Sequence, residues 1–380
     1  MQAGETVGGL AGFVEGLGLV DHHVHGALRA SVPRTSFETM LTEAPTVPVD
    51  GTIWDSQVGL AIRRWCPPLL DLPEHVDADA YWSRRCELGE EEVNRRLLAA
   101  SGTAAWIVET GYLGDQVIGV GEMAQASRAD AHEVVRLETI AEGLLLHSRD
   151  AAAFVASYPS VLADAARGSV GTKSVMAYRS GFRVSAERPS LRDVVDAVGR
   201  ELRRAQGERP RITDPLLLRH LQWCAIDLGL PLQIHCGYGD PDLDLDAANP
   251  VALMPWLRAV EPSHVPVVLL HNYPYHREAG YLAQVFSNVY FDVGLAVNYL
   301  GAASPRLIAE SLELGPFHKQ MFSSDAWGPA ELHYLGARLW RRGVASVVGE
   351  WVADGQWSDS DARRVLTLLA SENARRVYQL

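Results

Sequence analysis

Two histidines one residue apart, His23 and His25, follow the first apolar run of this 380-residue chain, in the segment VDHHVHG. In an extended segment, residues i and i+2 point to the same side, so both imidazoles can reach one point. Such a pair can bind a metal ion through two nitrogens. By itself the motif is weak, because a chain with 13 histidines offers surface or core histidines as an equally good interpretation.

Three further polar residues each come directly after an apolar run that is typical of a strand. His235 ends PLQIH, His271 ends VVLLH and Asp325 ends MFSSD. A buried strand gains nothing from ending in an imidazole or a carboxylate, since these groups are costly to desolvate unless they are paired or ligated. We therefore predict a divalent metal site. Nitrogen and oxygen ligands without a thiolate suit zinc, manganese, iron or nickel, and the residues alone do not choose among them.

The elements that must position these residues alternate between short strands and helices. Eight strands are predicted, at residues 17–20, 103–109, 134–139, 169–178, 231–235, 265–271, 289–293 and 321–325. Helical stretches such as 150–166 and 215–228 separate them. This alternation is typical of the α/β class and predicts a (β/α)8 TIM-type barrel. In a barrel the carboxyl ends of the strands meet at one face, so the predicted ligands should converge there.

Residues 30–102 depart from this alternation, and the strongest helix among them is 90–100. We predict a mainly helical insertion after the first strand that caps the barrel mouth, with a small separate domain as the alternative. Residues 1–380 are otherwise treated as a single barrel domain. After Asp325 we expect three extra helical stretches, of which the last, 371–378, begins with a serine cap.

Charge and composition exclude several classes of partner. The chain has 34 Lys and Arg against 47 Asp and Glu, a net charge of −13 that repels nucleic acid and anionic membranes. The four cysteines form no CxxC pair, so neither a disulfide framework nor a cysteine zinc site is expected. No run approaches the roughly 18 apolar residues of a membrane span. The first 16 residues lack Lys and Arg, unlike a secretory signal, so we expect a cytoplasmic protein.

Longer motifs around the candidate ligands resemble a known family. These motifs are TKSVMAYRSGF, PLQIHCGYGDPDLDL, LLHNYPYHREAGYLA and SENARRVY. With the order HxH, Lys, His, His and Asp along the predicted strands, they resemble the amidohydrolase-2 branch of the amidohydrolase superfamily. They are most similar to the amidohydrolase domain associated with glutamine-synthetase-like proteins. The resemblance runs from about Leu17 to the last residue.

The resemblance implies a role for each candidate ligand. His23, His25 and Asp325 would bind a first metal ion, and His235 would bind that ion or a second one. His271 would lie beside the metal as an acid, a base or a group that polarises a carbonyl. Asp325 would also accept a proton from the attacking water. One or two ions per chain are therefore expected.

Two basic residues near the fourth strand have alternative roles. Lys173 would be carboxylated and bridge two metals, as in binuclear relatives, or its ammonium would bind an anionic group of the substrate. Arg179 would bind a substrate carboxylate through its planar fork, or form an ion pair inside the barrel mouth. Tyr112, Tyr238 and Trp327 follow the second, fifth and eighth strands and are predicted to line the substrate pocket.

Three more polar residues lie near the predicted strand ends. Glu109 and Asp292 would either contact substrate or orient a histidine from behind. His22 should point away from the metal, because side chains alternate along a strand, and is interpreted as structural.

The resemblance implies a metal-dependent hydrolase that cleaves an amide C–N bond of a small molecule carrying a carboxylate, such as a γ-glutamyl amide. A metal-dependent, non-oxidative decarboxylase of an aromatic or unsaturated acid is the alternative. A non-catalytic binding or assembly module is the second alternative. Barrels of this kind are often dimers, so a homo-oligomer is also expected.

Overall fold

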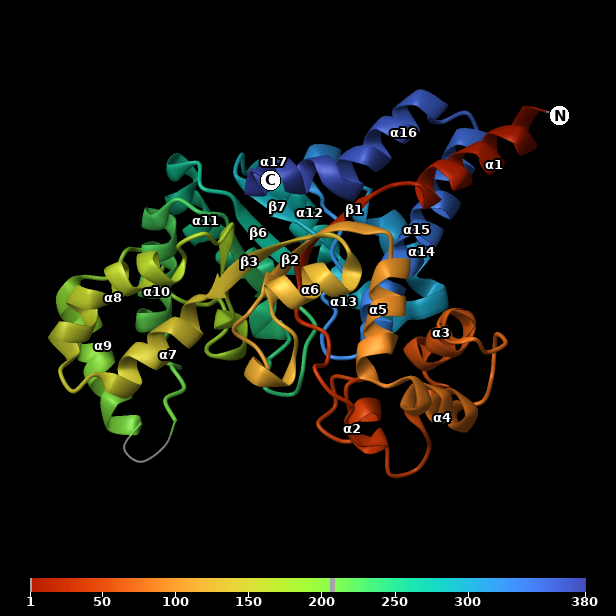
Figure 1. Cartoon of the computed structure of the whole chain (residues 1–380). Helices are drawn as coiled ribbons and strands as arrows, with labels where there is room; N and C mark the ends of the chain where they lie inside the picture. Colours follow the sequence, from red (N-terminus) through yellow and green to blue (C-terminus); the bar gives the residue numbers. More distant parts are fainter. Residues whose placement is uncertain (1, 206–208) are drawn as a thin grey trace. The chain divides into compact units, whose positions relative to one another are not determined.

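The computed structural model describes residues 2–205 and 209–380 (Figure 1). Its described residues form two compact units. Unit 2 comprises residues 133–291, and unit 1 comprises the described residues before and after them. In Figure 1, unit 2 runs from yellow to teal along the colour bar. Each unit is described separately below.

Unit 1 contains the first two strands and the helices between them. Strand β1 (Leu19–Val24) pairs in parallel with β2 (Thr103–Glu109), and all six residues of β1 are buried. The helices that separate the strands are α2 (Arg34–Thr39), α3 (Gln57–Trp65), α4 (Ala78–Leu88) and α5 (Glu90–Ala100), drawn in red to orange in Figure 1. This confirms the mainly helical insertion predicted after the first strand.

The predicted eighth strand, 321–325, lies along β1 without forming a regular strand. The His22 N–H donates to the Phe322 carbonyl at 3.2 Å, and the His25 N–H donates to the Ala326 carbonyl at 2.8 Å. In the opposite direction, the Asp325 N–H donates to the His23 carbonyl at 3.1 Å. These backbone contacts place Asp325 beside the HxH pair, about 300 residues away in sequence.

Further helices complete unit 1. They are α1 (Gln2–Glu15), α6 (Val120–Ser127), α13 (Gly294–Leu300), α14 (Ser304–Ser311), α15 (Ala330–Ala353), α16 (Asp359–Thr367) and α17 (Asn373–Tyr378). The extra C-terminal helices are confirmed, but the predicted serine cap is wrong. Ser371 lies inside a π-helical turn, Leu368–Glu372, that continues from α16, and its hydroxyl donates to the Thr367 carbonyl at 3.5 Å. Helix α1 was not predicted, because its glycines have low helix propensity.

Unit 2 contains the other parallel strands, except for the first three residues of β3, which belong to unit 1. Its strands follow in the order β3 (Asp130–Arg136), β4 (Gly171–Ser174), β5 (Leu232–Cys236), β6 (Val267–His271) and β7 (Val289–Phe291). Its helices are α7 (Leu137–His147), α8 (Ala151–Ala165), α9 (Leu191–Arg204), α10 (Pro215–Leu228), α11 (Met254–Val260) and α12 (His276–Val285). The element order confirms the predicted barrel class. Seven regular strands occur in the described residues, with 321–325 in the eighth place.

Most strand boundaries differ from those predicted. Strand β1 ends at Val24, although 17–20 was predicted, and the third and fourth strands differ as well. The third strand stops at Arg136 and α7 begins at Leu137, so the predicted strand 134–139 extended too far. The fourth strand stops at Ser174, although 169–178 was predicted. Glu138 explains the early end of β4, because its Oε1 accepts the Ser174 hydroxyl at 2.7 Å and the Val175 N–H at 3.0 Å. A side chain takes the hydrogen bond that a neighbouring strand would have accepted.

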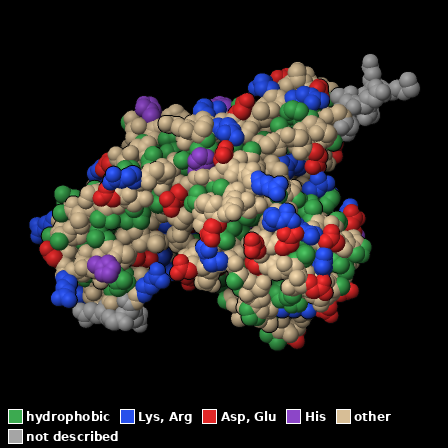
Figure 2. Space-filling view, viewed as in Figure 1, with side chains coloured by type: hydrophobic (Ala, Val, Ile, Leu, Met, Phe, Trp, Pro, Cys, Tyr) green, Lys and Arg blue, Asp and Glu red, His purple; other side chains and the backbone are tan. Residues whose placement is uncertain are grey.

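Acidic and basic side chains are interspersed on the face that Figure 2 shows. Within the described ranges, none of the helices combines the length and the hydrophobicity that crossing a bilayer requires.

Candidate metal centre

Three predicted ligands of unit 1, His23, His25 and Asp325, come together. Their ligand atoms all lie within 4.8 Å of one another, and all three residues are buried. The Oδ1 atom of Asp325 is 3.1 Å from Nε2 of His23 and 3.7 Å from Nε2 of His25. Two imidazoles and one carboxylate that converge in a buried place form a donor set that suits a divalent metal ion.

The local backbone around this triad is unusual. Strand β1 ends at Val24, which lies between His23 and His25 in the sequence. Both histidine rings point toward Asp325. Asp325 has a φ of +47°, in the left-handed region that residues other than glycine, asparagine and aspartate rarely adopt. Such a conformation costs of the order of 1 kcal/mol or more, and persists only where the surroundings enforce it. The structure therefore holds this carboxylate in a strained position.

Glu109, at the end of β2, orients His25 from behind. Its Oε2 lies 3.3 Å from Nδ1 of His25, and its own carboxylate accepts the Gly111 N–H at 2.6 Å. The backbone carbonyl oxygen of Glu109 is also 3.2 Å from this Nδ1, so two acceptors of Glu109 favour a proton there and leave Nε2 facing Asp325. Of the two roles predicted for Glu109, this contact supports the orienting one.

Asp292 and His22 pair with each other. Nε2 of His22 is 3.1 Å from Oδ2 of Asp292, and Nδ1 is 3.3 Å from the Tyr378 hydroxyl. Both residues of the pair are fully buried. His22 thus anchors α17 to β1, as its structural interpretation implies.

An aromatic pair borders the triad. The Tyr112 ring lies 5.2 Å from the ring of His25, and the Trp327 ring packs edge-on to Tyr112 at 5.7 Å. Both residues are partly exposed. They form an apolar wall next to a candidate metal ligand, which is consistent with their predicted place in a substrate pocket.

His333, on α15, was missed by sequence reasoning. Its Nε2 lies 2.9 Å from the His25 carbonyl oxygen, and its Nδ1 lies 3.2 Å from the Pro329 carbonyl. The Trp106 ring packs against it at 5.9 Å. Its sequence neighbourhood is that of an ordinary helix, so only the fold could reveal that it supports the HxH segment.

Unit 2 brings two other predicted ligands together. The rings of His235 and His271, on β5 and β6, are 4.6 Å apart, and both residues are buried. Nε2 of His235 donates to the Tyr238 carbonyl at 3.1 Å. Burial lowers the pKa of His235 well below its ordinary value, and the nearby charge of Lys173 lowers it further. The Tyr178 ring, which was not predicted, covers His235 at 4.5 Å.

Of the two basic residues predicted near the fourth strand, Lys173 is buried and Arg179 is partly buried. Lys173 is 2% exposed and is paired in register with Arg136 on β3 and with Gln233 on β5. Arg179 lies 3.1 Å from Glu142, and its side chain is 10% exposed. Desolvation lowers the pKa of Arg179, which the charge of Glu142 partly offsets. The ion pair proposed as one alternative for Arg179 is therefore present.

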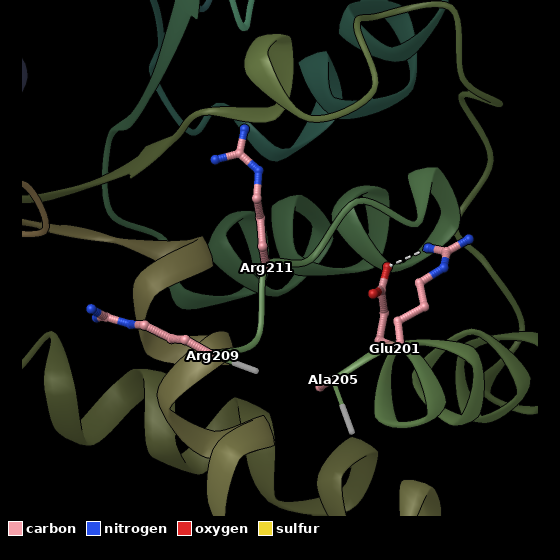
Figure 3. Close-up of a pocket in the computed structure, with 5 residues that line it drawn as sticks. Glu201, Ala205, Arg209 and Arg211 are labelled. Carbon is pink, nitrogen blue, oxygen red and sulfur yellow. Dashed lines mark hydrogen bonds and ion pairs between the residues drawn. The ribbon is translucent and has the colours of Figure 1, made fainter. Parts of the chain in front are cut away.

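A pocket elsewhere in unit 2 contains none of the predicted site residues. It is lined by Glu201, Arg204, Ala205, Arg209 and Arg211 (Figure 3). Glu201 accepts hydrogen bonds from Arg204 at 3.1 Å and from the Asp214 N–H at 2.6 Å, while Arg209 and Arg211 point away from it in Figure 3. Glu201 thus ties the end of α9 to the start of α10.

Comparison with known proteins identifies relatives of this chain. Residues 196–380 match the amidohydrolase family model. The chain is also 26% identical over 417 residues to the protein fluG of Emericella nidulans, a match that covers 99% of this chain and 47% of fluG. The chain therefore spans about half the length of this curated relative.

Solved structures resemble this chain as well. A Lactobacillus casei protein designated a metal-dependent hydrolase has a TM-score of 0.85 and 27% identity, with 97% of each chain covered. A uronate isomerase from Bacillus halodurans has a TM-score of 0.66 and 15% identity, covering 100% of this chain and 97% of its own. The second likeness concerns the fold alone. These matches show that residues 196–380 are similar to the amidohydrolase family, and that nearly the whole chain is similar to fluG and to the Lactobacillus casei protein.

Proposed function

We propose that this chain hydrolyses an amide C–N bond of a small molecule that carries a carboxylate. The buried triad of His23, His25 and Asp325 is the observation that supports the proposal. These residues would hold the ion, with zinc as the expected metal. A bound divalent ion supplies Lewis acidity and lowers the pKa of water from about 15.7 toward 7.

The residues of the chain would then move the protons. Asp325, whose carboxylate lies within 3.7 Å of both histidine Nε2 atoms, would take a proton from the attacking water and pass it to the leaving amine. His271 is predicted to stabilise the developing oxyanion. That role, and the metal contacts of His235 and Lys173, stay predictions from the sequence pattern, as do the second ion and the cytoplasmic location.

The proposal predicts that metal-loaded protein releases free amine from at least one member of a panel of γ-glutamyl and other carboxylate-bearing amides. Amine release should stop when the metal is removed with a chelator and resume when zinc or manganese is added back. Chromatographic separation of the released amine from the intact substrate measures this directly. A metal-loaded protein that leaves every amide of the panel intact contradicts the proposal.

One observation favours the alternative, a decarboxylase of an aromatic acid. The partly exposed rings of Tyr112 and Trp327 lie beside His25, where an aromatic substrate would stack on one of them. In that case the metal-loaded protein should release carbon dioxide from aromatic or unsaturated acids and form no amine. Measuring both products on the same protein separates the two reactions.

Arg179→Ala should raise KM for an anionic substrate about 10–100-fold more than KM for a neutral analogue. A charged hydrogen bond of this kind is worth about 1.5–3 kcal/mol, and the neutral analogue cannot form it. Steady-state kinetics on the two substrates measure the difference.

Arg183→Ala is the matched control for Arg179→Ala, because Arg183 forms an ion pair with Asp246 at 2.9 Å and its side chain is 71% exposed. It should change neither KM. An equal rise in both KM values for Arg179→Ala would show that the residue acts only through its ion pair with Glu142.

A further inference from the structure

Two buried residues outside the predicted ligand set, Asp21 and Ser324, hold each other next to the triad. Asp21 precedes His23 by two residues on β1, and Ser324 directly precedes Asp325. Oδ1 of Asp21 accepts the Ser324 N–H at 3.0 Å, and Oδ2 accepts the Ser324 hydroxyl at 2.5 Å. Both residues are fully buried. One carboxylate thus fixes both the backbone and the side chain of the residue before the candidate ligand.

Ser324 is held from other directions as well. Its Oγ accepts the Ala326 N–H at 3.1 Å, and its carbonyl accepts the Asn298 side-chain amide at 3.2 Å. Helix α15 packs directly against it, since a Cβ added at Gly336 would lie 2.4 Å from the Cβ of Ser324. Ser324 therefore cannot shift without disturbing β1, α13 and α15 together.

The preceding residue connects the same segment to the HxH pair. The Ser323 hydroxyl donates to the His23 carbonyl at 3.0 Å and accepts the Asp325 N–H at 3.2 Å. These two bonds tie the backbone N–H of Asp325 to the His23 carbonyl through the Ser323 hydroxyl. They therefore hold the residue that has the left-handed φ of +47°. The strained conformation is the one that brings Oδ1 of Asp325 to 3.1 Å from His23.

We propose that Asp21 and Ser324 are positioning residues that hold Asp325 in this strained conformation and thereby set the metal affinity of the triad. The inference rests on the proposed metal-dependent function. Supporting residues that fix the orientation of a ligand typically change metal affinity about 10–100-fold when they are removed. Without the hydrogen bonds between Asp21 and Ser324, Asp325 can relax to an ordinary backbone conformation. Its carboxylate would then move away from the two histidines.

The test compares zinc affinity across matched serine variants. Ser324→Ala removes the hydroxyl that donates to Asp21 and accepts from Ala326, and should weaken zinc binding about 10–100-fold. Ser311→Ala is the control, because Ser311 is equally buried and its hydroxyl also forms two hydrogen bonds, with Ile308 and Gln320, both at 2.7 Å. It should lower Tm to a similar extent and leave zinc affinity unchanged. Competition with a chromophoric chelator measures zinc affinity, and thermal unfolding measures Tm.

Asp21→Asn provides a second variant that keeps the size of the side chain and an acceptor for the Ser324 N–H. It should also weaken zinc binding. This second variant keeps the test valid if Ser324→Ala fails to fold. Wild-type affinity in both folded variants, or equal weakening by Ser311→Ala, overturns the positioning role while the metal function stands. Wild-type protein that takes up no zinc overturns the metal function first and this inference with it.

Discussion

Asp325→Ala should reduce the metal content of the purified protein from one or two equivalents per chain to less than about a tenth of that. Asp325 supplies the negative charge of the triad and lies within 3.7 Å of both histidine Nε2 atoms. Two neutral imidazoles without the carboxylate leave a divalent ion with an incomplete ligand set and no charge compensation. Plasma emission spectrometry on protein purified without chelator measures the content directly.

Two controls separate ligand loss from other effects of the Asp325 substitution. Asp325→Asn keeps the side-chain shape and tolerates a left-handed φ better than alanine does, yet it should still lose the metal. Asp79→Ala, in an ion pair with Arg34 where the aspartate side chain is 84% exposed, should retain it. If wild-type protein holds no metal and takes up neither zinc nor manganese, both enzymatic proposals fail. A non-catalytic binding or assembly module then becomes the leading interpretation.

The second large effect concerns a buried ionic cluster in unit 1. Arg85 of α4 donates from Nε to Glu331 at 2.8 Å, and from Nη1 and Nη2 to Glu90 at 2.8 and 2.6 Å. All three residues are at most 5% exposed. Burial disfavours the charge of Arg85, but the two carboxylates outweigh burial and raise its pKa. The Tyr81 hydroxyl donates a further hydrogen bond to Glu331 at 2.8 Å.

Arg85→Met should lower the free energy of unfolding by about 3–5 kcal/mol, because it leaves two carboxylates buried without their cation. Urea denaturation measures the change. Since Glu331 lies at the start of α15, six residues after Asp325, the variant also tests whether the helical insertion supports the segment that carries the candidate ligand.

Arg84→Met is the matched control for Arg85→Met. Arg84 is its neighbour on α4 and pairs with Asp71 at 2.7 Å at the surface, where the aspartate side chain is 60% exposed. Exposed pairs contribute about 0–1 kcal/mol, so this substitution should have a small effect. Equal losses from Arg84→Met and Arg85→Met would mean that the buried cluster contributes no more than a surface ion pair.

The sequence by itself determined the chemistry that is available to this chain and much of its element order. Period-two spacing was enough to place His23 and His25 on one side, because strand geometry is local. The ranges of β2, α5 and α10 were predicted without error for the same reason, since each carries its own local residue pattern, and α10 also begins at an Asp214 cap. The end of β4 was not predicted correctly, because the carboxylate of Glu138, on α7, binds Ser174 and Val175 and ends the strand.

Only the tertiary structure decided how the candidate ligand Asp325 is held. Asp21 and Ser324 are about 300 positions apart in the chain, and so are the partners His25 and His333. No local pattern signals such pairs, because a buried hydrogen bond depends on which strand and which helix become neighbours. The tertiary structure also pairs Glu109 with His25 and Arg85 with Glu331. The sequence left two roles open for Glu109 and indicated no partner for Arg85. Residue types and short spacings set the possible ligands of this protein, whereas long-range packing sets their orientation, because only packing can compensate a strained backbone and buried charges.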